Sequence, residues 1–173
     1  KEVGDKAGEG NSYCRLGNAY RCLGEFKTAI KYHQRHLKIA KEVGDKARER
    51  RSYFNLGVTY YNLGEFKTAI KYHQRLLEIA KEVGDKVGER ISYSNLGNAY
   101  QGLEDLKTSI TYHQRDLEIA KEVGDKAGEG NSYCRLGNAY RRLGEFKTAI
   151  KYHQRHRSEE RRVGKECRSR WSP

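Results

Sequence analysis

A period of 40 residues constrains this chain more than any other feature. The hexapeptide Lys-Glu-Val-Gly-Asp-Lys occurs four times, at Lys1, Lys41, Lys81 and Lys121. The 40-residue spacing contains no insertion, so we expect four units, at 1–40, 41–80, 81–120 and, shortened, 121–156. A fixed period of this length is typical of proteins in which each unit packs on its neighbours.

The segment 157–173 shares nothing with the units and holds the only Trp and the only Pro. It resembles the translation of a sequencing-library adapter, so we expect a non-native tail, with a genuine basic helix as the alternative. We expect the last repeat helix to end at His156. The chain contains no Met, which predicts a fragment of a longer protein. Units one and four differ at one of 36 positions, Cys22 against Arg142, which fits a recent duplication or a misassembly of repetitive DNA.

Each unit carries two apolar stripes at helical spacing. In the first unit they are Tyr13, Leu16, Gly17, Tyr20 and Leu23, followed by Phe26, Ala29, Ile30, His33, Leu37 and Ala40. The stripes predict helices over about 6–22 and 25–42. Gly24 and Gly44 suit helix ends, and Asp45 suits the cap of the next helix. Since no period-two alternation occurs, we predict an all-α fold, an α-α superhelical solenoid of antiparallel helix hairpins.

The pattern Tyr13-x-x-Leu16-Gly17-x-x-Tyr20, followed by Gly24 and Ala29, resembles the tetratricopeptide repeat, with Tyr13 where Trp is usual. The phrases NLGNAY and LGEFKTAIKYHQRHLKIA are similar to the long repeats of LGN/Pins-type scaffolds (G-protein signalling modulators) and of expanded invertebrate arrays. The resemblance implies protein–protein interaction in a concave groove lined by the first helix of each unit. It also implies work in the cytoplasm or at the cell cortex, in cell polarity, spindle orientation or G-protein signalling, although no GoLoco motif is visible.

Comparing the four units position by position separates two faces of the first helix. The apolar stripe is constant and is predicted to be packed, whereas the positions that change lie within about 50–80° of the opposite direction. A face that is free to differ is where a partner would be recognised. The predicted partner-binding residues are Asn11, Arg15, Asn18, Arg21, Arg51, Phe54, Asn55, Tyr61, Asn62, Asn95, Asn98, Gln101, Arg135, Asn138, Arg141 and Arg142.

The chemistry of the variable face indicates a short acidic peptide as ligand. Asparagine amides donate to and accept from a peptide backbone, arginines bind carboxylates, and Phe54 and Tyr61 offer aromatic anchors. The net charge is +12, of which 157–173 contribute +3 and the repeats +9. This charge also fits nucleic-acid binding as an alternative, although twelve of the 13 Tyr recur at fixed positions, which indicates packing rather than base stacking. Ordinary solvated helix surface is the third interpretation.

The sequence gives no support for an enzyme, a small-molecule substrate, a cofactor or a membrane span. It contains neither a Ser-His-Asp set nor a phosphate-binding loop, and no apolar run approaches 18–20 residues. His33 and His36 are three residues apart but lack a carboxylate or Cys partner, so we predict packing rather than a metal site. The four Cys show no CxxC spacing and suit a reduced, intracellular protein. Ser12 and its three equivalents are predicted to form local hydrogen bonds.

Unit three departs from the pattern. Glu104 replaces the turn glycine, Leu106 replaces Phe and Ser109 replaces Ala, so we expect the softest joint there. A second variable position lies in the second helix of each unit and is occupied by His36, Leu76, Asp116 and His156.

Overall fold

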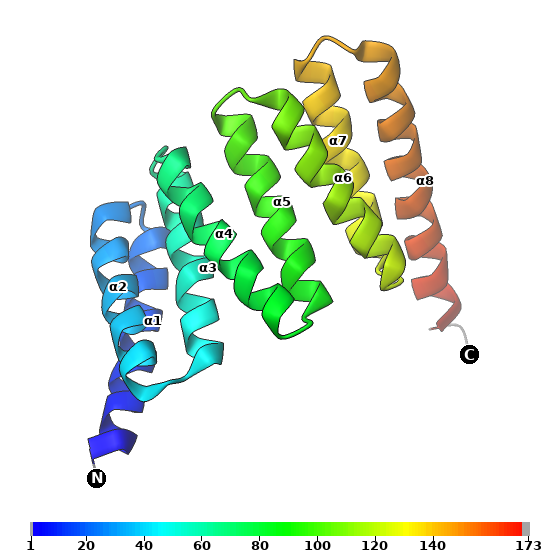
Figure 1. Ribbon diagram of the computed structural model, residues 1–173. Coiled ribbons are helices and arrows are strands. Elements are labelled where there is room, and N and C mark those ends of the chain that lie inside the picture. The colour runs from blue at the N-terminus through cyan, green and yellow to red at the C-terminus, as the bar shows by residue number, and fades with distance from the viewer. Residues whose placement is uncertain (1, 171–173) are drawn as a thin grey trace. The chain divides into compact units, whose positions relative to one another are not determined.

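Eight α-helices form the part of the chain that the computed structural model describes, which is the backbone of residues 2–170 and the side chains of residue 6 and residues 8–162. They are α1 (Glu2–Cys22), α2 (Phe26–Val43), α3 (Lys46–Asn62), α4 (Phe66–Glu82), α5 (Lys86–Gly102), α6 (Leu106–Glu122), α7 (Lys126–Arg142) and α8 (Phe146–Arg170) (Figure 1). No strand occurs in residues 2–170. The predicted all-α fold of helix hairpins is confirmed.

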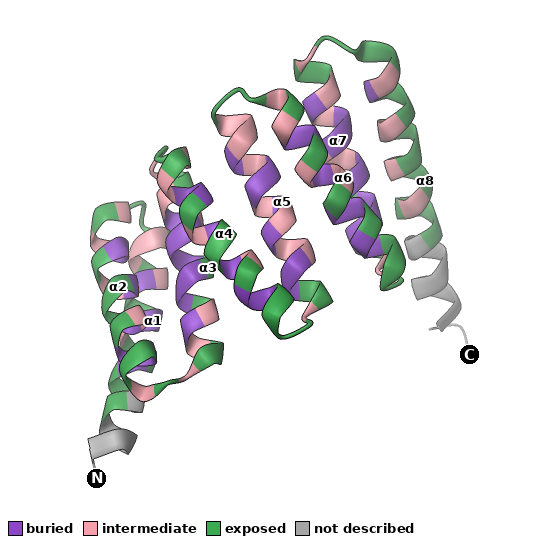
Figure 2. Cartoon of the chain, viewed as in Figure 1, coloured by how far each residue is buried: buried purple, intermediate pink, exposed green. Residues whose placement is uncertain are grey.

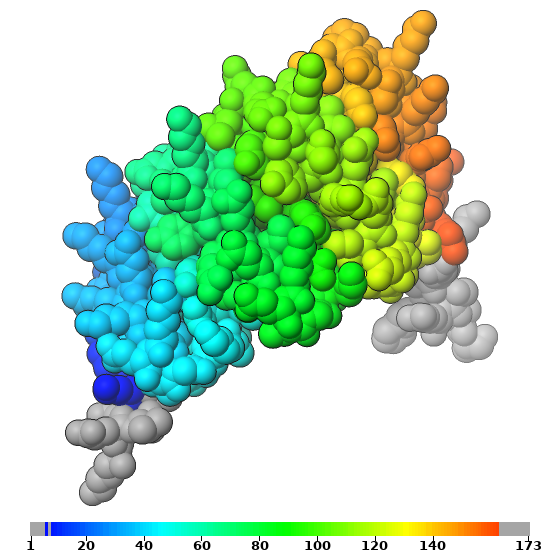
Figure 3. Space-filling model, viewed as in Figure 1, coloured from blue at the N-terminus to red at the C-terminus, as the bar shows by residue number. Residues whose placement is uncertain are grey.

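The helices group into two compact units, Lys1–Glu82 and Val83–Pro173, each larger than one 40-residue repeat. From here on these two are called the first unit and the second unit. In the first unit α1 packs on α2, α2 on α3 and α3 on α4, and α5 to α8 repeat this order in the second. Side chains of the first unit close over the spaces that the ribbons leave (Figure 3). The finer boundaries between 40-residue repeats remain a prediction.

Each unit has an apolar core around the first helix of its second hairpin, which packs against neighbouring second helices. In the first unit Tyr53 of α3 packs with Leu76 and Ile79 of α4, with Leu37 of α2 against them. In the second unit Leu136 of α7 belongs to a cluster with Ile110 and Leu117 of α6. Buried residues therefore recur along α3 and α7, whereas the described part of α8 is largely exposed or half-buried (Figure 2).

Two residues of the predicted packed stripe are more exposed than expected. Leu16 is 41% exposed, while its counterpart Leu136 is fully buried against α6, because α1 packs only on α2 and α3 within its described unit. Leu23 is also exposed, since it follows the last residue of α1 and lies in the turn rather than on the helix face.

The predicted punctuation of the helices is confirmed. Gly24 has φ +80° and Gly44 has φ +73°, the left-handed conformation that a glycine adopts at little cost. The Asp45 side chain accepts a hydrogen bond from the Arg48 backbone N–H at 3.0 Å and so caps α3. Glycine after one helix and aspartate before the next thus fix the ends of the hairpins.

The turn between α5 and α6 is strained. Glu104 occupies the place that glycine holds in the other hairpin turns and has φ +63°, the one positive φ of a non-glycine residue in the described chain. A side chain in this conformation costs about 1 kcal/mol. The Glu104 carboxylate lies 3.9 Å from Arg142 Nη2, but it is exposed, so this ion pair offsets little.

We expect Glu104→Gly to raise the free energy of unfolding by about 1 kcal/mol, because glycine removes the clash at this φ. Urea unfolding followed by circular dichroism measures the change. Gly64→Glu places the same strain at the equivalent turn of the first unit, where Gly64 has φ +83°, and is expected to lower stability by a similar amount. A loss of stability in Glu104→Gly would contradict this account.

The C-terminal helix is longer than predicted. The expectation that it ends at His156 is wrong, because α8 runs from Phe146 to Arg170. The segment after His156 is rich in arginine and glutamate, which have high helix propensity and sustain a helix without an apolar stripe. Two large apolar side chains are exposed on α8, where Phe146 is 63% and Ile150 is 56% exposed. Ile30 and Ile110, the counterparts of Ile150, are buried.

Candidate functional site

A pocket opens between α1 and α3 in the first unit, with a volume of about 560 Å³. Its lining consists of residues from positions that vary among the repeats: Asn11, Cys14, Arg15, Asn18, Arg51, Phe54 and Asn55. Six of these seven were predicted as partner-binding residues. The structure thus brings together side chains that lie up to 44 residues apart in the chain, because α3, the first helix of the next hairpin, lies beside α1.

The rim of this pocket is positively charged. Arg15 and Arg51 are exposed, and within the described side chains neither forms an ion pair with a carboxylate. Phe54 is 37% exposed and adds apolar surface to the lining. The pocket therefore offers two guanidinium groups and one aromatic ring to a ligand.

The floor of the pocket is built from amides around a buried thiol. Asn55 Nδ2 donates to Cys14 Sγ at 3.6 Å, and Asn18 Nδ2 lies 4.0 Å from the same sulfur. Asn55 is only 7% exposed, so its amide is less available to a ligand than the sequence suggested. The repeat comparison placed Asn55 on the face that lines the pocket, but it could not show that the Asn55 amide already donates a hydrogen bond to the Cys14 thiol.

The other predicted residues of the first unit lie outside this pocket lining. Arg21, Tyr61 and Asn62 lie near the C-terminal ends of α1 and α3. The Tyr61 ring meets Phe66 edge-on, with ring centroids 5.4 Å apart, and so is used in packing at the turn before α4.

In the second unit α5 and α7 carry the corresponding face. The half-buried residues on it are Asn95, Asn98, Gln101, Arg135 and Asn138, while Arg141 and Arg142 are exposed. Asn138 Nδ2 lies 3.8 Å from Cys134 Sγ and repeats the contact of Asn18 with Cys14. Arg142 Nη1 donates to the backbone oxygen of Gln101 at 3.0 Å, so this guanidinium also ties α7 to α5.

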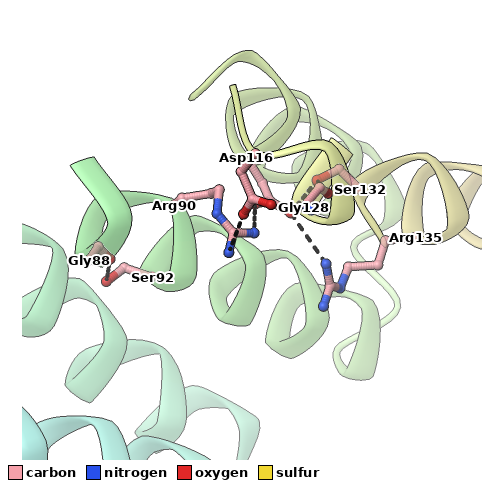
Figure 4. Close-up of polar contacts among 8 residues, drawn as sticks. Gly88, Arg90, Ser92, Asp116, Gly128, Ser132 and Arg135 are labelled. Atoms are coloured by element: carbon pink, nitrogen blue, oxygen red, sulfur yellow. Dashed lines mark hydrogen bonds and ion pairs between the residues drawn. The ribbon is translucent and has the colours of Figure 1, made fainter. Parts of the chain in front are cut away.

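Asp116 of α6 is a fully buried carboxylate at the centre of a polar cluster (Figure 4). Its Oδ1 lies 3.4 Å from Arg90 Nη1, and its Oδ2 lies 3.4 Å from Arg135 Nη1. The Ser132 hydroxyl donates to Oδ2 at 2.8 Å. Burial raises the pKa of Asp116, and the Ser132 hydroxyl and the guanidiniums of Arg135 and Arg90 act in the opposite direction.

The matching position of the first unit has a different chemistry. His36 of α2 is buried, and its Nδ1 lies 2.8 Å from the Ser52 hydroxyl of α3. The same hydroxyl also donates to the Arg48 carbonyl at 2.8 Å, so Ser52 lies between the ring and the backbone of its own helix. Burial, followed by Arg51 and Arg48, lowers the pKa of His36, so the neutral imidazole is favoured.

The sequence matches one protein family over most of its length. Residues 8–82 and 89–158 match the tetratricopeptide repeat. The chain belongs to the tetratricopeptide repeat family. No curated protein matches it at the level of sequence.

Solved structures support the same fold. BtubC (BKLC) from P. vanneervenii is 22% identical, with a TM-score of 0.81 over 90% of this chain and 64% of that one. A signal-transduction ATPase of the STAND class with a tetratricopeptide repeat sensor, from Pyrococcus horikoshii, is 23% identical, with a TM-score of 0.84 over 94% of this chain. Aspartyl phosphate phosphatase F from Bacillus subtilis is 16% identical, with a TM-score of 0.81 over 90% of this chain.

This chain spans only part of those proteins, namely 64% of BtubC, 41% of the phosphatase and 25% of the ATPase. At these identities the likeness shows the fold alone. As a tetratricopeptide repeat chain it is a protein–protein interaction scaffold.

The histidines of the tetratricopeptide helices pack rather than cluster with other ligands. Among the described side chains no three His, Cys, Asp or Glu residues come close enough to hold a metal ion. His33 is fully buried against the backbone of Gly17. None of the described helices is long and apolar enough to cross a membrane.

Sequence reasoning missed the Asp116 cluster, although a signal was present. The second-helix position that reads His36, Leu76, Asp116 and His156 was recognised as variable. The residues that contact this position were not recognised, because Ser52 and Ser132 were expected to form only local hydrogen bonds. Those bonds do form, to the carbonyls of Arg48 and Gly128, but the same hydroxyls also contact His36 and Asp116.

Proposed function

We propose that this tetratricopeptide chain binds an acidic linear segment of a partner protein on the variable faces of its first helices. The pocket between α1 and α3 carries the proposal, because it joins two exposed arginines without carboxylate partners to an aromatic ring and a polar floor. Arginine binds carboxylates with two parallel hydrogen bonds, and amides bind the backbone of an extended peptide. The net charge of +12 draws an acidic partner toward this surface.

The resemblance to LGN/Pins-type scaffolds extends the proposal to a setting. A protein of that kind works in the cytoplasm or at the cell cortex, in polarity, spindle orientation or G-protein signalling. Scaffolding requires no catalytic residues or cofactor. The segment 157–173 has no part in the proposed binding.

Reversing two charges at the pocket tests the proposed function. In the full chain, Arg15→Glu combined with Arg51→Glu is expected to weaken binding of a fluorescent acidic peptide at least tenfold, because both guanidiniums become carboxylates. Fluorescence anisotropy measures the affinity. The matched control is Lys31→Glu with Lys71→Glu, which makes the same change of charge at exposed positions of α2 and α4.

Equal losses in the two double variants would show that general electrostatics, not the pocket, holds the peptide. The alternative ligand, a nucleic acid, is favoured by the same net charge. Affinity for single-stranded or duplex DNA would fall steeply with rising salt, as counterions are released from the phosphates. Retention of nucleic acid at physiological salt, together with unchanged peptide binding in the arginine variant, would replace the proposal.

A further inference from the structure

The two units carry the same helix face with different charges. Adding 80 to the residue numbers of the first-unit pocket gives its counterpart on α5 and α7. Asn95 then stands in the place of Arg15, Asn131 in that of Arg51, and Arg135 in that of Asn55. At these equivalent positions the first face has two arginines, one on α1 and one on α3, and the second has one, on α7.

Arg135, the arginine at the pocket-equivalent positions of the second face, already has a carboxylate. Arg135 Nη1 lies 3.4 Å from Asp116 Oδ2, and Asp116 is fully buried (Figure 4). Arg90 approaches the other oxygen at 3.4 Å and also pairs with Asp125 at 3.3 Å. The guanidiniums of Arg90 and Arg135 are thus both held by acids of the same unit.

No such acid serves the first face. The second-helix position that holds Asp116 is His36 in the first unit, and burial keeps that imidazole neutral. Within the described residues Arg15 and Arg51 have no carboxylate partner. Their charge remains available to an incoming anion.

We propose that selection for acidic residues resides in the first-unit pocket, and that Asp116 acts as a built-in competitor that makes the second face select uncharged polar residues. This inference rests on the proposed function and assigns its charge specificity. An intramolecular carboxylate has a high effective concentration, so a ligand carboxylate must displace it to reach Arg135. It also repels an approaching anion, which is a means of excluding the wrong ligand.

Two matched substitutions separate the faces. Arg51→Gln and Arg135→Gln each remove one charge and keep a polar side chain. With a fluorescent acidic peptide and the full chain, Arg51→Gln is expected to weaken binding about tenfold, as one charged contact is lost. Arg135→Gln is expected to change the affinity less than about twofold, because its charge is already neutralised.

A third substitution tests the competitor itself. Asp116→Asn keeps an acceptor for the Ser132 hydroxyl but removes the charge that holds Arg135, so binding of the acidic peptide is expected to strengthen about threefold or more. The gain must vanish in Asp116→Asn with Arg135→Gln. Circular dichroism on each variant reports whether the helices are retained, and the comparison of Arg51→Gln with Arg135→Gln does not require Asp116→Asn to fold.

The possible outcomes distinguish this inference from the proposed function. If the unaltered chain binds neither the acidic peptide nor its glutamine-substituted analogue, the proposed function fails and the inference falls with it. If the acidic peptide binds but Arg51→Gln and Arg135→Gln weaken it equally, the inference alone is overturned. A larger loss of peptide affinity in Arg51→Gln than in Arg135→Gln supports the inference. A gain of affinity in Asp116→Asn that disappears when Arg135 is also replaced supports the role of Asp116 as a competitor.

Discussion

Between pH 7 and pH 4.5 the protein is expected to lose on the order of 6 kcal/mol of unfolding free energy, enough to unfold a domain of ordinary stability. The cause is a set of buried histidines. Burial lowers the pKa of His33 and of His73 to about 4, and burial followed by Arg135 lowers the pKa of His113 to about 3. Each contributes about 2 kcal/mol to the loss at pH 4.5.

The contacts of these rings explain the shifts. Among the described residues neither ring nitrogen of His33 or of His113 has a hydrogen-bond partner. A protonated ring would therefore place a charge in the core without an acceptor. Above pH 6.5 the rings are neutral in both the folded and unfolded chain, so their contribution is fully present.

The direction of the effect follows from proton binding. As the pH falls from 6.5 to about 4, the unfolded chain binds protons that the folded chain does not, and stability falls. Glu49 acts in the same direction at lower pH, because its hydrogen bond with Lys46 lowers its pKa. Asp116 acts in the opposite direction, since burial raises its pKa and its protonation favours the folded chain.

Urea midpoints measured at a series of pH values test this expectation. His73→Phe keeps a planar ring against Gly57 but cannot titrate. Between pH 6.5 and pH 4 the slope of the unfolding free energy against pH is therefore expected to correspond to about one fewer proton taken up on unfolding. Urea midpoints that stay constant from pH 7 to pH 4.5 in the unaltered chain would contradict the role given to the histidines.

Gly57→Ala is expected to destabilise the first unit by about 2 kcal/mol or more. A Cβ at Gly57 would lie 2.4 Å from Cε1 of the His73 ring and 2.7 Å from each ring nitrogen. His73 is buried, so its ring has no free space to enter. The overlap outweighs the gain of about 1 kcal/mol that alanine brings to a helix.

A matched control separates the clash from helix propensity. Gly8 is also helical, and a Cβ there would meet nothing within 4 Å, so Gly8→Ala is expected to be neutral or to stabilise by up to about 1 kcal/mol. Combining Gly57→Ala with His73→Ala removes the overlapping ring, and the double-mutant cycle is expected to show strong positive coupling. Additive losses would refute the contact as the cause.

Much of the fold could be predicted from particular residues. The apolar stripes placed the helices within a few residues of their observed ends, and Gly24, Gly44 and Asp45 marked the turns correctly. Gly17 and His33 were both predicted to lie on packed stripes, but not to be partners. Their contact depends on how α1 and α2 are rotated against each other, which a single helix pattern does not specify.

The candidate site was predicted less completely. Comparing the units found six of the residues that line the first pocket, because a face that varies is not needed for packing. It did not find that the Asn55 amide donates a hydrogen bond to Cys14, or that Asp116 forms an ion pair with Arg135. Both contacts join different helices, and their strength depends on burial rather than on residue type.

The pairing of Asp116 with Arg135 limits how such arrays can grow. The two residues lie on successive hairpins, 19 positions apart, so a duplication that copied α6 beside a hairpin lacking this arginine would bury an acid with fewer counter-charges. The segment that must be copied as a whole is therefore the end of one hairpin together with the start of the next, rather than a single hairpin. Recombination that shuffles repeats freely is expected to leave this pair linked.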